Sequence, residues 1–363
     1  MVGGDALGPG LLLRAVRAAV PAMRRRAAAL DAAAAFPRED LEALRAVGLL
    51  AAPLPVALGG FGAGTEPDGA RLAFALLRLL GQGNLAVGRL VEAHVNALRL
   101  VVRYGTAEQQ RRAAADARAG HLFGLWVTDP SGERLGRAAG RLVGRKGPCS
   151  GAGHCTRALV TVDAPESTRM AFLALGGAEP VTGDPTALHG MRAARNGVVD
   201  LTGAAVPDAA LVGAPGDYLR EPDFSCGAWR TTACTLGGLD ALVDAARDQL
   251  TRRGHAGAPL QQARFAEVLI AQETARLWAR RAALVAERNG PVADRVAYVN
   301  LARLAVEAAC LDALRLIQRS LGLAAFVAPN PVERLARDLG TYLRQPAPDA
   351  VLLEAGQHGL SAG

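Results

Sequence analysis

The chain has 363 residues, enough for two or three domains of ordinary size with a substantial core, so it is not a small scaffold held together by disulfides or metal. Half of the residues are hydrophobic and 21% are charged, which is typical of a globular protein rather than a disordered one. The net charge of +7 comes from arginine, because Lys146 is the only lysine, and these arginines are spread among Asp and Glu without the interleaved aromatic residues that favour nucleic-acid binding.

Compartment and redox state are indicated by the apolar runs and the cysteines. No apolar run approaches the roughly 20 residues that cross a bilayer. Leu11-Leu12-Leu13 is followed by the basic cluster Arg24-Arg25-Arg26, the reverse of the basic-then-apolar order of a secretory signal. The cysteines are odd in number and irregularly spaced, unlike a disulfide framework. We therefore predict a cytoplasmic protein that contacts neither membrane nor nucleic acid and carries free thiols.

Residues 1–120 are predicted to form an α-helical block. Pro37 stands where a second helix begins and Gly48 where it ends. Thr106 is a favourable N-cap with Gln109 three residues later. The predicted helices span residues 10–34, 36–48, 69–80, 84–104 and the segment after 106.

Residues 121–218 change to a β pattern. Leu122-Phe-Gly-Leu-Trp-Val-Thr-Asp-Pro130 ends in a turn and predicts a strand, and Gly144 to Gly153 predicts a strand and turn beside it. Short apolar pieces follow between Gly, Pro, Asp and Asn turns. They predict an antiparallel β domain with strands near residues 158–162, 170–175 and 198–201.

Residues 219–363 return to helices. Apolar residues recur every three to four positions over 228–253, 260–288, 292–321 and 332–342, with Gly and Pro breaks between them. Helices this long must pack on one another, so the sequence predicts an antiparallel bundle.

This order of elements and four motifs resemble the acyl-CoA dehydrogenase family. The motifs are Phe36-Pro37 with Gly48-Leu49-Leu50, Pro53 and Gly59-Gly60-Phe61-Gly62; Tyr104-Gly-Thr-Ala-Glu-Gln-Gln110; Val127-Thr-Asp-Pro130; and Leu321-Gly322 with Pro331-Val-Glu-Arg-Leu-Ala-Arg-Asp338. The resemblance covers nearly the whole chain. It implies a mainly α fold with a central antiparallel β domain: an N-terminal α block (1–120), a β-barrel-like middle domain (121–218) and a C-terminal four-helix bundle (219–363).

The resemblance also implies FAD bound between the β domain and the bundle of a homodimer or homotetramer. A flavin ring needs hydrogen bonds at its polar edge and an apolar wall. By position in the motifs, Trp126, Val127 and Thr128 would lie beside the ring and Ser150 near N5. Arg253 and Arg319 would reach the FAD phosphates and adenosine, partly across the subunit interface.

The family's glutamate, which removes a proton alpha to a thioester, has no counterpart in this chain. Its usual position is Pro346, and the alternative position used by some members falls near Ala228-Trp229. Asp349 is the nearest substitute base, and Glu354 is farther along. Three other family features are altered: Glu133-Arg134 replaces the pyrophosphate-binding Gly-Ser, Gly322-Leu-Ala-Ala325 replaces a Gly-Gly-x-Gly, and Pro148 replaces a tryptophan.

Relatives without the glutamate include monooxygenases that react reduced flavin with oxygen, and such a site needs hydrogen-bond donors in an apolar pocket. His94, His154 and Ser150 are the candidates, because an imidazole is easily poised as an acid near neutral pH. Cys149, His154 and Cys155 do not have the spacing of a zinc site, so no metal is predicted.

Three functions remain open on the sequence. The first is an FAD oxidoreductase that acts at the CH-CH group of an acyl thioester or related small molecule, with an electron-transfer partner. The second is a monooxygenase supplied by a flavin reductase. The third is an inactive relative that serves as a binding module.

Overall fold

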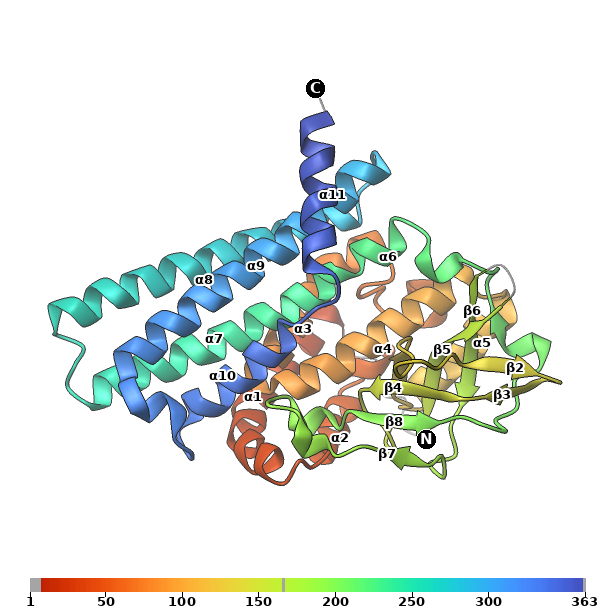
Figure 1. Cartoon of the computed structure of the whole chain (residues 1–363), viewed down its shortest axis with the longest axis horizontal. Helices are drawn as coiled ribbons and strands as arrows, with labels where there is room; N and C mark the ends of the chain where they lie inside the picture. Colours follow the sequence, from red (N-terminus) through yellow and green to blue (C-terminus); the bar gives the residue numbers. More distant parts are fainter. Residues whose placement is uncertain (1–7, 165–166, 362–363) are drawn as a thin grey trace.

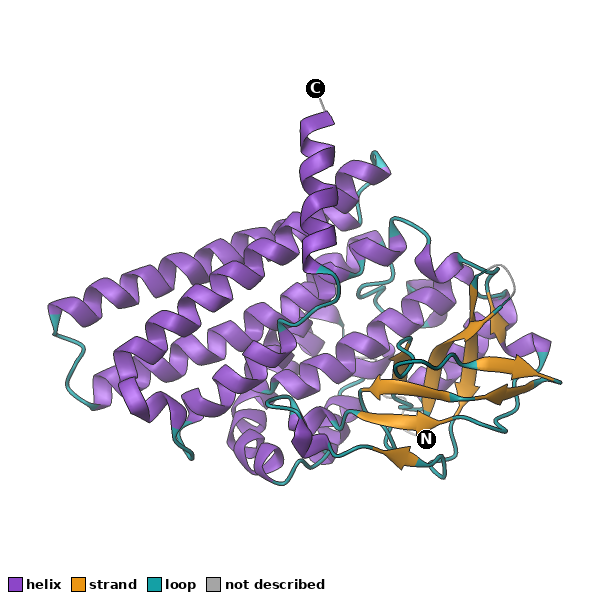
Figure 2. Cartoon of the chain, viewed as in Figure 1, coloured by secondary structure: helices purple, strands orange, loops and turns teal. Residues whose placement is uncertain are grey.

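The computed structural model describes residues 8–164 and 167–361, and the chain is mainly helical with its strands gathered in the middle of the sequence, as predicted (Figures 1 and 2). The first helices are α1 (Pro9–Ala32), α2 (Arg38–Ala46), α3 (Ala70–Gly83), α4 (Leu85–Tyr104) and α5 (Ala107–Arg118). The predicted cap at Thr106 is confirmed as a complete capping box with Gln109. Gly48 follows α2 in the left-handed conformation (φ 79°), which a residue with a side chain rarely adopts.

The strands form three small sheets. The bounds are β1 (Phe123–Trp126), β2 (Gly136–Ala138), β3 (Arg141–Val143), β4 (Arg145–Cys149), β5 (Arg157–Asp163), β6 (Thr168–Ala174), β7 (Val181–Thr182), β8 (Gly197–Asp200) and β9 (Leu211–Val212). The sheet orders are β1-β5-β6-β9, β2-β3 and β4-β8-β7.

β4 lies beside β1, as predicted, but the two strands belong to different sheets. The pairings are antiparallel except that β1 runs parallel to β5, so β5 rather than β4 is the hydrogen-bonded neighbour of β1. β4 pairs with β8 in another sheet. A single backbone hydrogen bond, from Gly147 N to the Thr128 carbonyl at 2.9 Å, still joins the segment after β1 to β4.

The C-terminal helices are α6 (Asp223–Cys226), α7 (Ala228–Arg252), α8 (Pro259–Ala286), α9 (Val292–Leu321), α10 (Pro331–Tyr342) and α11 (Pro348–Ser361). Glycine lets α3 and α7 approach closely: a Cβ on Gly237 would lie 2.0 Å from the Arg78 carbonyl, and one on Gly81 would lie 2.2 Å from the Cys234 carbonyl. α11 extends away from the bundle in Figure 1.

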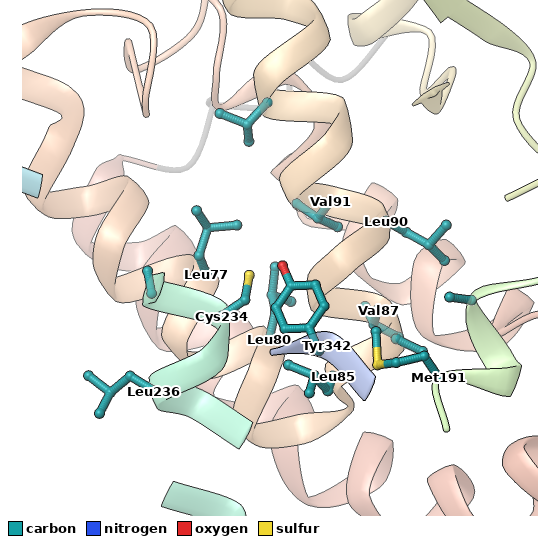
Figure 3. Close-up of a cluster of buried hydrophobic side chains, with 14 of the residues drawn as sticks. Leu77, Leu80, Leu85, Val87, Leu90, Val91, Met191, Cys234, Leu236 and Tyr342 are labelled. Carbon is teal, nitrogen blue, oxygen red and sulfur yellow. The ribbon is translucent and has the colours of Figure 1, made fainter. Parts of the chain in front are cut away.

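Helix α4 is the centre of the molecule. Most of its residues are buried, because it packs against β1 on one side and against α3 and α7 on another. Figure 3 shows Tyr342, at the end of α10, inserted among Leu77, Leu80 and Leu85 beside Cys234. The end of α10 is therefore held in the core, which fixes where the following segment begins.

The motif at residues 331–338 holds neighbouring parts of the fold together. Arg337 pairs with Asp31 of α1 at 2.7 Å and donates to the His189 carbonyl at 2.9 Å. Asp338 is buried and accepts a hydrogen bond from Met191 N at 2.6 Å. Gly190 fits against α10 so tightly that a Cβ would lie 2.2 Å from the Arg337 carbonyl. These contacts join α1, α10 and the loop before β8.

Within the described residues, no helix combines the length and apolar character needed to cross a membrane.

Candidate functional site

A cavity of about 210 Å³ lies between α4, the start of α7 and the segment joining α10 to α11. Its walls come from six separate parts of the sequence, and we call it the α4–α7 cavity. The lining residues are Glu92, Asn96, Arg99, Leu100, Leu125, Tyr218, Asp223, Phe224, Gly227, Ala228, Arg230, Thr231, Arg303, Gln345 and Pro346.

Both positions where the resemblance implies a glutamate line this cavity. Ala228 is the first residue of α7, and Pro346 follows α10. The carbonyl of Pro346 accepts a hydrogen bond from Arg303 Nη2, and Gln345 Nε2 donates to the Tyr342 carbonyl at 2.7 Å. A guanidinium therefore lies beside residue 346 in the cavity.

Glu92 is a cavity-lining carboxylate that the sequence did not single out. It lies on α4 and is only 2% exposed. Its Oε2 pairs with Arg89, and its Oε1 accepts hydrogen bonds from Asn96 Nδ2 and, at 3.3 Å, from Thr231 Oγ1. The sequence feature that could have identified Glu92 is its position as the only carboxylate in the mostly apolar segment Leu90–Val95. A buried charge there is costly unless it is paired.

A network of ion pairs includes three residues that line the cavity, Arg99, Asp223 and Arg230. Arg99 contacts Glu287 at 2.9 Å and Asp223 at 3.2 Å, while Arg230 lies 3.5 Å from Glu287. Burial raises the pKa of Asp223, but the hydrogen bond from Tyr104 (2.9 Å) and the charges of Arg99 and Arg103 outweigh it, so the pKa stays below its usual value. Asp223 is therefore an ionised partner of Arg99 and Arg103.

Burial, reinforced by the like charge of Arg99, lowers the pKa of Arg230 to about 10. Arg230 Nε donates a hydrogen bond to Asn96 Oδ1, so this side of the guanidinium has its hydrogen-bond partner within the protein. The network thus fixes Arg230 and Asn96 at the cavity wall as charged and polar contacts.

β1 presents alternate side chains to opposite faces, which separates the residues predicted to line a flavin. Leu125 lines the cavity, whereas Trp126 is buried and donates from Nε1 to the Ser150 carbonyl at 3.0 Å. The Ser150 hydroxyl is itself buried and donates to Asn196 Oδ1 at 2.7 Å. Val127 is half-buried and Thr128 is exposed at the end of the strand. Trp126 and Ser150 are therefore brought together, but in the core.

His94 is fully buried behind β1. Its Nε2 hydrogen is donated to the Leu50 carbonyl at 2.8 Å, and its Nδ1 accepts from Phe123 N at 3.2 Å. Burial lowers its pKa to about 4, so the ring is neutral near pH 7. Both nitrogens are bound to backbone, which gives His94 a structural role between α4, β1 and the loop at Leu50.

His154 and the nearby cysteines lie elsewhere in the fold. The His154 ring stacks on Phe36, with ring centroids 4.2 Å apart. Cys155 is buried, and burial raises its pKa to about 12; burial also raises the pKa of Cys149. Across residues 8–164 and 167–361, no group of three or more His, Cys, Asp or Glu side chains is arranged to hold a metal.

The remaining predicted residues lie outside the cavity. Arg253 and Arg319 are exposed where α7 and α9 end, and Arg253 Nη1 lies 3.5 Å from the Leu321 carbonyl. Asp349 is exposed in the first turn of α11 and does not line the cavity. Pro148 is exposed next to the segment that follows β1.

Comparison with known proteins shows similarity at the levels of sequence and fold. Residues 11–121 match the family model described as acyl-CoA dehydrogenase, N-terminal domain. The mitochondrial short-chain specific acyl-CoA dehydrogenase of Rattus norvegicus is 25% identical over 338 residues, which cover 86% of this chain and 80% of that protein.

Two solved structures illustrate the similarity of fold. Butyryl-CoA dehydrogenase from Megasphaera elsdenii superposes with a TM-score of 0.83 at 15% identity, covering 97% of this chain and 98% of that chain. Dibenzothiophene monooxygenase (TdsC) from Paenibacillus sp. also has a TM-score of 0.83, at 19% identity and 97% coverage of each chain. At these identities the superpositions establish the fold alone.

Proposed function

Because the chain belongs to the acyl-CoA dehydrogenase family, we propose that it is a flavin-dependent oxidoreductase whose small-molecule substrate binds in the α4–α7 cavity. The observation that carries this proposal is that both family positions for the glutamate, Ala228 and Pro346, line one cavity together with Leu125 of β1. The substrate pocket is thus retained in outline, while its catalytic group has changed.

The groups at the end of β1 fit one face and one edge of a flavin ring. Leu125 and Val127 supply an apolar wall, and the exposed Thr128 hydroxyl supplies a donor and acceptor for a polar ring edge. Trp126 and Ser150 do not add side-chain contacts in this arrangement, because one is buried and the other donates to Asn196. When bound, the flavin supplies a two-electron acceptor or, when reduced, a donor to oxygen.

We propose Glu92, rather than Asp349, as the base for oxidation of a CH-CH group. Its carboxylate lines the cavity, whereas Asp349 is exposed on α11. Asn96 and Thr231 hold Oε1 in place, so its position is fixed before substrate arrives. Glu92 would accept the proton alpha to the carbonyl, and Arg89 would remain its counter-ion.

The test is reconstitution with FAD and FMN followed by anaerobic titration with short-chain acyl-CoA. We expect a yellow protein whose flavin absorbance is bleached by the thioester, and we expect Glu92→Gln to abolish bleaching while the exposed Glu42→Gln leaves it intact. Glu92→Asp, which keeps the charge, separates a folding defect from loss of the base. A protein that stays colourless with excess FAD and FMN would refute the proposal and favour an inactive binding module.

A second candidate is a monooxygenase that uses reduced flavin. The specific observation in its favour is that neither residue 228 nor residue 346 is acidic, combined with the fold shared with FMN-bound TdsC. This candidate predicts no bleaching by acyl-CoA. Instead, substrate oxidation would require a flavin reductase, a nicotinamide reductant and oxygen.

We further propose that the flavin is FAD and that the protein forms a homodimer or homotetramer. Arg253 and Arg319 are exposed and thus available to FAD phosphates, including those of a second subunit. Apolar side chains on the outer faces of α8, α9 and α11 are exposed and suit a subunit interface. They are Ile270, Leu277, Leu311, Leu352 and Leu353. Light scattering after size exclusion tests the oligomer, and chromatography of heat-released flavin distinguishes FAD from FMN.

A further inference from the structure

Arg303 is a cavity-lining arginine without a carboxylate partner. It projects from α9 and donates from Nη2 to the carbonyl of Pro346. Among the described residues, no carboxylate lies within ion-pair distance of its guanidinium, and its buried Nε has no hydrogen-bond partner. Glu307, one turn along α9, pairs with Arg344 at 3.0 Å instead.

The other arginines beside the cavity have carboxylate partners. Arg89 pairs with Glu92, and Arg99 and Arg230 both contact Glu287. Among the described residues, Arg303 is therefore the cavity-lining arginine that has no ion-pair partner. Burial lowers the pKa of Arg303, and the charge of Glu307, which raises the pKa, offsets this effect only in part.

We infer that the α4–α7 cavity binds a substrate bearing a carboxylate, and that Arg303 holds this carboxylate beside residue 346. A guanidinium donates hydrogen bonds to a carboxylate, and among the described residues Nη1 of Arg303 has no hydrogen-bond acceptor, while Nη2 donates to the Pro346 carbonyl. The inference rests on the proposed function only in that it assigns the substrate class of the same site.

The cavity's size and remaining charges narrow the ligand. A volume of about 210 Å³ is below the roughly 300 Å³ at which drug-sized pockets begin, so the group held inside has few heavy atoms. Glu92 and Asp223 already pair with Arg89 and Arg99, so Arg303 offers one positive charge, which matches a single carboxylate better than a dianion such as phosphate. A short-chain carboxylate with a polar or apolar tail fits these limits.

The test measures ligand binding to the purified full chain and needs no turnover. Thermal shift and calorimetry are run with propionate, the uncharged isostere propionamide, and phosphate, all at constant ionic strength against chloride. We expect saturable stabilisation by propionate, little by propionamide, and less by phosphate than by propionate.

Variants then assign the binding to Arg303. Arg303→Gln should weaken propionate binding by about tenfold or more, because hydrogen bonds to a charged group are lost. Arg303→Lys should restore part of it, and Arg315→Gln, exposed on the same helix, should change nothing. The melting temperature of Arg303→Gln without ligand should not fall, because the substitution removes a partly buried guanidinium that has no ion-pair partner.

Equal binding of propionate by wild type and Arg303→Gln, or equal binding of propionate and propionamide, would overturn the inference. Tighter binding of phosphate would show an anion site of another class and would overturn it too. Flavin uptake is measured in a separate experiment, by the visible spectrum. A yellow protein that ignores carboxylates refutes this inference alone, whereas a colourless protein that binds propionate refutes the flavin proposal alone.

Discussion

Trp126 donates its indole hydrogen to the carbonyl of Ser150 at 3.0 Å, which joins β1 to the turn after β4 inside the core. We predict that Trp126→Phe lowers the free energy of unfolding by about 1–3 kcal/mol, because the buried carbonyl loses its strongest donor and the smaller ring leaves a void. Flavin content per folded chain should be unchanged. Urea unfolding and the visible spectrum check both statements, with the half-buried Trp278→Phe as the control. A large loss of flavin at unchanged stability would instead place Trp126 at the ring.

Because burial lowers the pKa of His94, we predict that the protein loses stability in acid. Its pKa is about 4 in the folded protein and about 6.5 when unfolded, so the unfolded chain binds the proton more readily. Stability from the neutral ring is complete above about pH 6.5 and is lost as the pH falls toward 4; between about pH 7.5 and 5 the loss is on the order of 2 kcal/mol.

Urea unfolding at these two pH values measures the loss. In His94→Gln, which can still donate to Leu50 and accept from Phe123, this part of the pH dependence should disappear. An unchanged pH dependence in the variant would assign the effect to other groups.

Gly190 and Gly340 form a matched pair of glycine substitutions. Gly190→Ala would press a Cβ against the Arg337 carbonyl at 2.2 Å, so we expect a destabilisation of about 1–3 kcal/mol or more. Gly340→Ala meets nothing within 4 Å in the last turn of α10 and should stabilise by up to about 1 kcal/mol. Opposite shifts in the urea midpoint are the expected result. Equal shifts would mean that the loop before β8 does not pack against α10 in solution.

Ala228→Glu should install a base at a cavity position. The residue begins α7, where the helix dipole favours a carboxylate. We expect acyl-CoA bleaching of the flavin to speed up by roughly 10²-fold or more, the usual contribution of a positioned general base. Ala308→Glu, exposed on α9, is the control. Slow bleaching in a variant that retains flavin and binds the thioester would show that residue 228 does not face the reacting carbon.

The sequence predicted the elements well because their signals are local. Thr106 with Gln109 specified the start of α5, and the motif ending at Pro130 located β1. Trp126, however, points into the core while its neighbour Leu125 lines the cavity, since neighbouring side chains of a strand point to opposite faces; Val127 and Thr128 lie beyond the end of β1. The motif indicated the place but not the direction of each side chain.

Local sequence patterns could not predict which residues form the candidate site. Glu92 and Arg303 are ordinary charged residues of two helices, and they become neighbours of one cavity only when α4, α7 and α9 pack together. His94 illustrates the reverse case: an imidazole suggested catalysis, but backbone groups at Leu50 and Phe123 account for both nitrogens. Such partners are set by tertiary contacts, which spacing along the chain does not reveal.

Lys146, the only lysine of the chain, is 1% exposed, and its ammonium lies 2.6 Å from Asp129 and 2.9 Å from Thr161 Oγ1. Lysine-directed cross-linkers and biotinylation reagents will therefore find no ε-amine on the folded surface, and mapping of any partner must target carboxylates or arginines. The same burial makes acylation of Lys146 a reporter of opening at the junction of β1 and β4, readable by mass spectrometry as a label on the peptide that contains Lys146.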